Sequence, residues 1–325
     1  MTDQPLVPAS RQVPTLMSRS LPRLFVDAGE QACRRLIEFF TANIRNKNTR
    51  EAYARAVGRF SDWFEHHKIR LEQVSPPLIA AYIEEMSTTH SAPSVKQHLA
   101  AIRMLLDYLV IGQALPVNPA SSVRGPKHVI TRGKTPVLSA EQARQLIDAI
   151  DSSTIAGLRD RALIAVMVFS FARVSAVIGM NGDDYYPDGK RWWFRLHEKG
   201  GKLHEVPAHH KAEEYLDAYL DAAGMLLGKR DPLFRSIDRR RRLTERRIDR
   251  REVLAMVKRR ARNAGLPDRI GCHTWRATGI TTYLLGGGTL ERAQQIAAHS
   301  SAKTTKLYDR RNDEITLDEI ERIVI

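Results

Sequence analysis

Near its C-terminal end the chain reads Cys272-His273-Thr274-Trp275-Arg276, then Ala298-His299-Ser300-Ser301, then Thr304-Thr305-Lys306-Leu307-Tyr308. His273 and Arg276 are three residues apart, so a helix places them on one face. His299 follows Arg276 after 23 residues, and Tyr308 follows His299 after nine. Two upstream segments belong with them: Phe171-Ala172-Arg173-Val174-Ser175 and Glu198-Lys199-Gly200-Gly201-Lys202.

These residue types suit the breakage and rejoining of a phosphodiester through a covalent phosphotyrosine. Two guanidiniums, Arg173 and Arg276, can clamp the non-bridging oxygens, on which charge builds in the transition state. A tyrosine with an ordinary pKa of about 10 needs its proton drawn off before it attacks. The expelled sugar hydroxyl needs a proton donor, which a lysine can be, and a histidine can handle a further proton.

The chain resembles the tyrosine site-specific recombinases (integrases and Xer-type resolvases) from about residue 32 to about residue 310. The resemblance lies in the spacing from His299 to Tyr308, in Thr-Thr-x-x-Tyr and in Arg159-Asp160-Arg161-Ala162-Leu163-Ile164. It implies that six residues are catalytic: Arg173, Lys199, His273, Arg276, His299 and Tyr308. It also implies a 3′-phosphotyrosyl intermediate and a free 5′-hydroxyl, formed with no cofactor, ATP or metal.

Three positions depart from the pattern of the family. The acidic residue often found three after the first arginine is Ala176, the second histidine after His-x-x-Arg is Ala277, and the glycine before the later histidine is Ala298. These are supporting positions, so we expect an active enzyme. Lys199 and Lys202 share one turn; the family spacing favours Lys199, but both remain candidates.

Composition indicates a polyanionic partner. The net charge is +14, which favours double-stranded DNA. No apolar run reaches the length of a membrane span, and no secretory signal is recognisable, so we expect a cytoplasmic, nucleoid-associated protein with no membrane contact. Two distant cysteines, Cys33 and Cys272, exclude a disulfide framework and a cysteine-rich zinc site, and we expect no metal.

The first part of the chain predicts an all-helical domain. Residues 1–31 read as a flexible extension and residues 32–124 as helices, one of them N-capped at Asn48-Thr49. The predicted inward faces share three- and four-residue spacing: Tyr53, Val57, Phe60 and Phe64 on one helix, and Val95, Leu99, Ile102, Leu106 and Leu109 on another. A further helix runs from Leu78 to Met86. This domain resembles the SAM-like core-binding domain of the family.

The second domain is predicted to be mostly helical (α+β) with a small antiparallel sheet. Gly and Pro mark residues 125–137 as a linker, and residues 138–325 form the catalytic domain. Leu138-Ser139-Ala140-Glu141 starts a helix, and residues 192–196 and 203–207 read as two strands around the lysine turn. The fold class is thus a two-domain protein.

Basic residues predict where DNA binds. Twelve of the 24 residues from 239 to 262 are Arg or Lys; Arg239, Arg240, Arg241 and Arg242 are expected in a loop that contacts phosphates. A helix is expected over 246–262, with Val253, Leu254 and Val257 inward. Weaker candidates, in the helical domain, are Lys47, Arg50, Lys96 and Arg103.

Two other functions fit parts of this pattern. A type IB topoisomerase uses a similar site on one duplex, although the N-terminal motifs resemble those of recombinases. A catalytically silent DNA-binding regulator could share the scaffold, although the complete residue set argues against it. The resemblance also implies a tetramer on paired DNA sites. The acidic tail, residues 313–325, has Leu317, Ile320 and Val324 at helical spacing and must dock, either on its own domain or on a neighbouring protomer.

Overall fold

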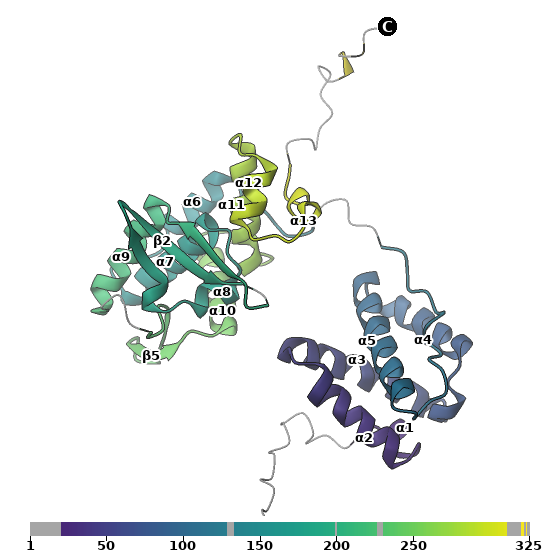
Figure 1. The fold of residues 1–325 in the computed structure, drawn as a ribbon. Coiled ribbons are helices and arrows are strands. Elements are labelled where there is room, and N and C mark those ends of the chain that lie inside the picture. The colour runs from purple at the N-terminus through teal and green to yellow at the C-terminus, as the bar shows by residue number, and fades with distance from the viewer. Residues whose placement is uncertain are drawn as a thin grey trace, which may run out of the picture. The chain divides into compact units, whose positions relative to one another are not determined.

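A computed structural model describes residues 21–128, 133–198, 200–225 and 230–310, with 320, 321 and 323. The chain divides into two compact units, residues 1–129 and 130–325, which are described separately (Figure 1). The first unit is helical in its described part, and the second is mostly helical with small antiparallel sheets. The fold class predicted from the sequence is therefore confirmed.

The first unit packs its helices around one apolar core. Its elements are α1 (Arg23–Val26), α2 (Glu30–Glu38), the π-helical turn η2 (Phe39–Asn43), α3 (Lys47–His66), the 3-10 turn η3 (Leu71–Gln73), α4 (Pro76–Thr89) and α5 (Ala92–Ile111). The predicted inward faces of α3 and α5 are buried, except that Tyr53 is only partly buried. Apolar residues at helical spacing thus located this core correctly.

Two predictions for this unit need correction. The N-cap of α3 is Asn46, whose side chain accepts from the Thr49 backbone N–H at 3.1 Å, and not Asn48-Thr49. Residues 21–31 were expected in a flexible extension, yet α1 lies there and buries Leu24 and Phe25 in the core. A helix of one turn is too short to show a periodic pattern in sequence, which is why this boundary was placed too late.

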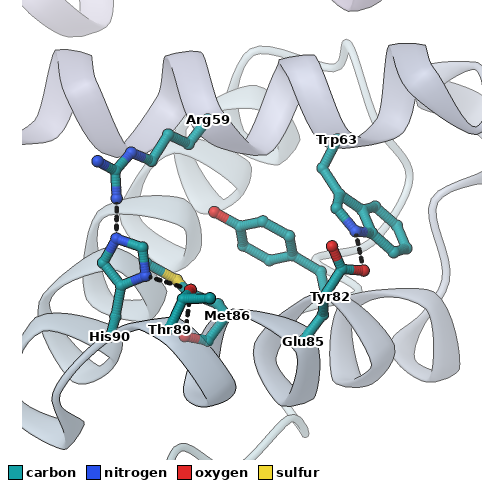
Figure 2. Close-up of a pocket in the computed structure, with 7 residues that line it drawn as sticks. All are labelled: Arg59, Trp63, Tyr82, Glu85, Met86, Thr89 and His90. Atoms are coloured by element: carbon teal, nitrogen blue, oxygen red, sulfur yellow. Dashed lines mark hydrogen bonds between the residues drawn. The ribbon is translucent and has the colours of Figure 1, made fainter.

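A shallow pocket lies between α3 and α4 in the first unit, as Figure 2 shows. Trp63 Nε1 donates to Glu85 Oε2 at 2.7 Å, and Arg59 contacts His90. Tyr82 lies between these two pairs, and burial raises the pKa of its hydroxyl to about 12. None of the predicted catalytic residues lines this pocket.

The second unit combines helices with two small antiparallel sheets. Its elements are α6 (Ala140–Asp148), α7 (Ile155–Phe169), α8 (Val174–Gly179), η4 (Gly182–Asp184), β1 (Tyr185–Asp188), β2 (Arg191–His197), β3 (Leu203–Pro207), α9 (His210–Ala223), β4 (Arg235–Ile237), β5 (Leu243–Arg247), α10 (Arg250–Asn263), α11 (Cys272–Leu285), α12 (Leu290–Ile296) and α13 (Ala302–Lys306). The antiparallel order β1-β2-β3 contains both predicted strands. The sequence reading missed β1 and the β4–β5 hairpin.

The core of this unit forms around α7, which is buried along most of its length and packs against α9 and α11 (Figure 1). A glycine allows α11 to lie close to α7: a Cβ at Gly279 would come within 2.1 Å of the Val168 carbonyl oxygen. The close approach holds α11 in place beside the end of α7. Because α11 carries His273 and Arg276, this contact bears directly on the site.

The Arg-Asp-Arg motif in α7 is a structural ion cluster. The Asp160 carboxylate is fully buried and accepts from Arg159 Nη2 at 2.6 Å and from Arg260 Nη2 at 2.8 Å. Arg259 adds a longer contact of 3.4 Å, and Arg159 Nη1 also donates to the Arg235 carbonyl oxygen. One carboxylate therefore ties α7 to α10, and its arginine partner ties α7 to β4.

Replacing Asp160 with alanine is expected to destabilise the protein by about 3–5 kcal/mol, because it leaves buried guanidinium charge unpaired. Urea unfolding of the full chain measures this loss. Asp188→Ala, at an exposed position on β1, is the control and should change stability by less than about 0.5 kcal/mol. Equal stability of both variants would show that the cluster does not stabilise the fold.

The basic segment 239–262 differs in part from its prediction. Arg239 to Arg242 lie, as predicted, in the turn between β4 and β5. The helix begins only at Arg250, because Asp249 caps it and Arg246 and Arg247, where the helix was expected to begin, belong to β5. Leu254 is 41% exposed, so its predicted inward position is wrong. Val253 and Val257 are buried as predicted, and Met256 lies on the same buried face. Leu254 directly follows Val253, and on a helix of 3.6 residues per turn adjacent side chains point in directions about 100° apart, so Leu254 faces away from the core.

Candidate active site

Five of the six predicted catalytic residues gather in the second unit. Arg173 caps the N-terminus of α8, His273 and Arg276 lie on α11, His299 follows α12, and Tyr308 follows α13. Lys199 lies outside the described residues. Lys202, its rival, is exposed, and its carbonyl oxygen accepts from the Glu198 backbone N–H at 2.8 Å. The choice between the two lysines therefore stays a prediction.

Tyr308 is held firmly and contacts both histidines. Its side-chain oxygen lies 2.8 Å from His273 Nε2, and its ring stacks on the ring of His299 with centroids 5.9 Å apart. The Tyr308 carbonyl oxygen accepts from Thr281 Oγ1 on α11 at 2.9 Å. Only 8% of Tyr308 is exposed. The phenol is thus fixed beside α11, although it lies 35 residues from His273 in sequence.

The electrostatics of the site set the protonation states of Tyr308 and His273. Burial raises the pKa of Tyr308, although the charges of Arg276 and Arg173 oppose this shift. Loss of hydration, with the same two arginines, lowers the pKa of His273. At neutral pH the phenol is therefore protonated and the imidazole neutral, and in the Nδ1–H tautomer of His273 the Tyr308 hydroxyl donates to Nε2.

Arg276 is buried and tethers two chain segments. It is 1% exposed; its Nη1 donates to the Phe171 carbonyl oxygen and its Nη2 to the Ala297 carbonyl oxygen, the latter at 2.6 Å. Its Nε has no hydrogen-bond partner among the described residues. Burial and the charge of Arg173 lower the pKa of Arg276 to about 10. It remains a cation at neutral pH.

His299 is oriented by the threonine motif that precedes Tyr308. Its Nδ1 lies 2.8 Å from Thr305 Oγ1, and both residues are buried. Burial, followed by the charges of Arg276, Arg173 and His273, lowers the pKa of His299 to about 3. His299 is thus neutral at neutral pH. Thr305 belongs to the Thr-Thr-x-x-Tyr motif, but no role was predicted for it from the sequence.

The departures from the family pattern are visible in the structure. Ala298 has a φ of +48°, a left-handed conformation in which alanine is less favourable than glycine by roughly 1 kcal/mol. Ala176 and Ala277 are fully buried, so each presents a methyl group where the family often has a polar side chain. No carboxylate on α8 supports Arg173.

A carboxylate from another element contacts both arginines. Glu198 follows β2, and its Oε2 accepts from Arg173 Nη1, while its Oε1 lies 4.0 Å from Arg276 Nη1. Its side chain is 3% exposed. From the sequence, this glutamate was known only as the neighbour of Lys199, and no role was predicted for it. The absence of an acid at Ala176 was the only signal that could have directed attention to it.

The predicted DNA-binding residues fall into two groups. Arg50 donates twice to the Ile44 carbonyl oxygen, and Arg103 donates to the carbonyl oxygens of Ala120 and Val123. These two arginines therefore support their own unit. The others are exposed and could reach a phosphate: Lys47, Lys96, Arg239, Arg240, Arg241 and Arg242.

Two further predictions concern metal binding and membrane contact. The described residues contain no group of three or more His, Cys, Asp or Glu side chains placed to hold a metal ion. In the same part of the chain, no helix has both the length and the apolar character that crossing a membrane requires.

Comparisons with known proteins agree with this geometry. The profile of the phage integrase family matches residues 136–314, and that of the phage integrase N-terminal SAM-like domain matches residues 38–112. The tyrosine recombinase XerC of Thermodesulfovibrio yellowstonii is 30% identical over 270 residues, which cover 81% of this chain and 85% of the relative. XerC of Chlamydia muridarum is 32% identical over 227 residues, covering 70% and 69%.

Solved structures share the fold at low sequence identity. The XerH site-specific recombinase bound to difH substrate superposes with a TM-score of 0.68 and 17% identity, covering 93% of this chain and 95% of that one. A lambda integrase tetramer bound to a Holliday junction gives 0.64 and 18%, covering 88% and 79%.

The chain therefore belongs to the phage integrase family. Its activity is that of a tyrosine recombinase, and its function is site-specific DNA recombination. The resemblance read from the sequence is thereby confirmed.

Proposed function

We propose that Tyr308 is the nucleophile that opens the DNA strand and carries it as a 3′-phosphotyrosyl ester, releasing a 5′-hydroxyl. The observation that supports this most strongly is the contact of the Tyr308 hydroxyl with His273 Nε2, next to two arginines. A 5′-hydroxyl from the partner duplex then attacks the phosphotyrosine. The ester keeps the bond energy, so strand exchange needs no ATP, cofactor or metal.

His273 and the arginines assist the attack in this proposal. Neutral His273, in its Nδ1–H tautomer, takes the Tyr308 proton at Nε2, because the lowered imidazole pKa keeps the ring uncharged before the attack. Arg173 and Arg276 stabilise the charge that builds on the non-bridging phosphate oxygens. His299, oriented by Thr305, offers its other ring nitrogen to the same phosphate.

Covalent capture tests this function. The protein is incubated with nicked duplexes of random sequence, and adducts that survive denaturation are isolated and sequenced. A nick lets the short cleaved product diffuse away, so the adduct accumulates. We expect capture of one recurring sequence, which would also supply the substrate for the variants below. Failure to capture any DNA, with a folded protein that binds DNA, would contradict the proposal.

Lys199 is proposed as the general acid that protonates the leaving 5′-oxygen. Lys199→Ala should therefore cleave slowly, and a substrate with sulfur in place of that oxygen should restore the rate, since a thiolate leaves without a proton donor. Lys202→Ala is the matched control and should show no such rescue. Rescue of the Lys202 variant alone would assign the role to Lys202.

The exposed turn between β4 and β5 is proposed to bind DNA phosphates. Replacing Arg239, Arg240, Arg241 and Arg242 with glutamine should weaken binding to all sequences alike. The slope of log affinity against log salt should flatten by roughly 0.9 for each phosphate that the protein no longer neutralises. Titration of two unrelated duplexes at several salt concentrations measures both effects. A loss confined to one sequence would mean that this turn reads bases.

Assembly and organisation complete the proposal. We propose that the protein forms a tetramer on two paired DNA sites in the cytoplasm, at the nucleoid, and serves a mobile element or a chromosome. The solved lambda integrase tetramer supports this assembly by its shared fold.

We place the core DNA-binding domain before the linker 125–137 and the catalytic domain after it. Most of the tail 313–325 lies outside the described residues; we propose that it docks on a neighbouring protomer.

A further inference from the structure

Glu198 is a buried acid that contacts both Arg173 and Arg276, the pair of arginines proposed to clamp the phosphate. It stands where β2 ends and the turn toward β3 begins, and its backbone closes this turn through bonds to Lys202 and Gly201. Its carboxylate meets Arg173 Nη1 through one oxygen and lies 4.0 Å from Arg276 Nη1 through the other. The two arginines come from chain segments more than 100 residues apart, and this one side chain bridges them.

The position needs a negative charge. Arg173 and Arg276 are close enough that the charge of Arg173 lowers the pKa of Arg276. Like charges repel strongly where water is scarce, and an unpaired buried ion is costly. Ala176, in the turn of α8 that follows Arg173, supplies no carboxylate. Glu198 supplies it from the β2–β3 hairpin instead.

We propose that Glu198 is a positioning residue that holds the Arg173 guanidinium next to Arg276, so that both face one phosphate. The proposal rests on the proposed role of these arginines in cleavage. Glu198 meets each arginine at its Nη1 atom. Arg173 is about one-third exposed, with a side-chain accessibility of 34%, so its remaining donors can reach an incoming phosphate. The carboxylate thus stays in place during the reaction and orients the clamp.

An alternative role for the contact between Glu198 and the two arginines predicts the opposite effect of removing Glu198. If the carboxylate occupied the place of the phosphate in the DNA-free protein, DNA would have to displace it. Removing Glu198 would then tighten DNA binding and speed cleavage. Under our proposal, removal lets Arg173 swing away from Arg276 and slows cleavage, with little change in DNA affinity.

The experiment measures single-turnover adduct formation on the captured duplex by Glu198→Ala, Glu198→Gln and the unchanged protein. We expect Glu198→Ala to be slower by roughly 10–100-fold, the scale of misplacing one catalytic group by about 1 Å. Glu198→Gln keeps an oxygen that accepts from Arg173, so it should lose less. Glu205→Ala, in the same hairpin and on an exposed acid paired with Arg195, should cleave at the unchanged rate.

A modified substrate separates positioning from loss of folding. A methylphosphonate at the cleaved position has a methyl group in place of one charged oxygen. Its cleavage therefore needs less charge stabilisation from the two arginines. The defect of Glu198→Ala should shrink on it to within about threefold, as should that of Arg173→Ala, because less charge needs stabilisation. The 5′-sulfur substrate should not restore the rate, which separates Glu198 from the lysine beside it.

Three results for Glu198→Ala would overturn the proposal: faster cleavage than the unchanged protein, cleavage at the unchanged rate, or an equal defect on the phosphate and the methylphosphonate substrates. The proposed function is judged separately, by adduct formation with the unchanged protein and with Glu205→Ala. If these form adducts and Tyr308→Phe does not, the nucleophile stands whatever Glu198 does.

Discussion

Tyr308→Phe is expected to abolish the covalent protein–DNA adduct and to leave DNA affinity nearly unchanged. The variant removes one hydroxyl, which is the only atom of this side chain able to form the ester. It keeps the ring that stacks on His299, and the backbone bond from Thr281 to the carbonyl oxygen does not depend on the side chain. Folding and the large charged DNA interface should therefore persist.

Denaturing gels measure the adduct of this variant, and filter binding measures its DNA affinity. Tyr283→Phe is a matched control, because Tyr283 is a partly buried tyrosine packed against the same small apolar cluster as Tyr308. It should form adducts at the unchanged rate. An adduct that persists in Tyr308→Phe would assign the nucleophile to another residue.

Arg276→Ala is expected to slow cleavage by a factor of roughly 10²–10³, the cost of losing one preorganised donor to the transition state. The structure adds a second reason. Arg276 donates to carbonyl oxygens just before Arg173 and just before His299, so it also holds these two residues in place. Both acceptor positions lie at left-handed backbone: Phe171, whose carbonyl accepts from Arg276, and Ala298, which follows the accepting Ala297, have positive φ angles.

Arg276→Lys separates the charge from the forked geometry. A lysine keeps the cation but lacks the planar fork whose two separate Nη atoms reach the two carbonyl oxygens, so it should also cleave poorly. Arg292→Ala, at an exposed arginine on α12, is the control and should cleave normally. Urea unfolding shows how much of each loss reflects stability. Normal cleavage by Arg276→Ala in a folded protein would place the clamp elsewhere.

Local patterns in the chain predicted the helices and most of the site. The faces of α3 and α5 followed from apolar residues three and four apart, since burial of one side of a helix repeats every 3.6 residues. Arg173, His273, Arg276, His299 and Tyr308 were identified by their residue types and by the resemblance of their order and spacing to the tyrosine recombinases, and the structure brings them together. The one-turn helix α1 and the short strands β4 and β5 were not predicted, because such segments contain too few residues to show a periodic pattern.

Contacts between distant segments could not be predicted in the same way. The Asp160 carboxylate meets Arg260 across 100 residues of chain, and Arg276 meets the Phe171 carbonyl across 105. Nothing in the local sequence distinguished Arg50 and Arg103, which bind backbone carbonyls, from the exposed Lys47 and Lys96. A basic side chain has the same local pattern whether it faces a carbonyl or solvent.

Residue types, together with the resemblance to the tyrosine recombinases, therefore predicted the chemistry, because a phosphodiester demands particular donors and a nucleophile in any fold. The packing of α7 against α11 and the turn after β2 determined where the side chains of the site lie relative to one another. They placed the Glu198 carboxylate between two arginines and set the Tyr308 hydroxyl against His273. The physical reason is that charge and hydrogen bonding depend on distance in space, and folding fixes those distances between residues far apart along the chain.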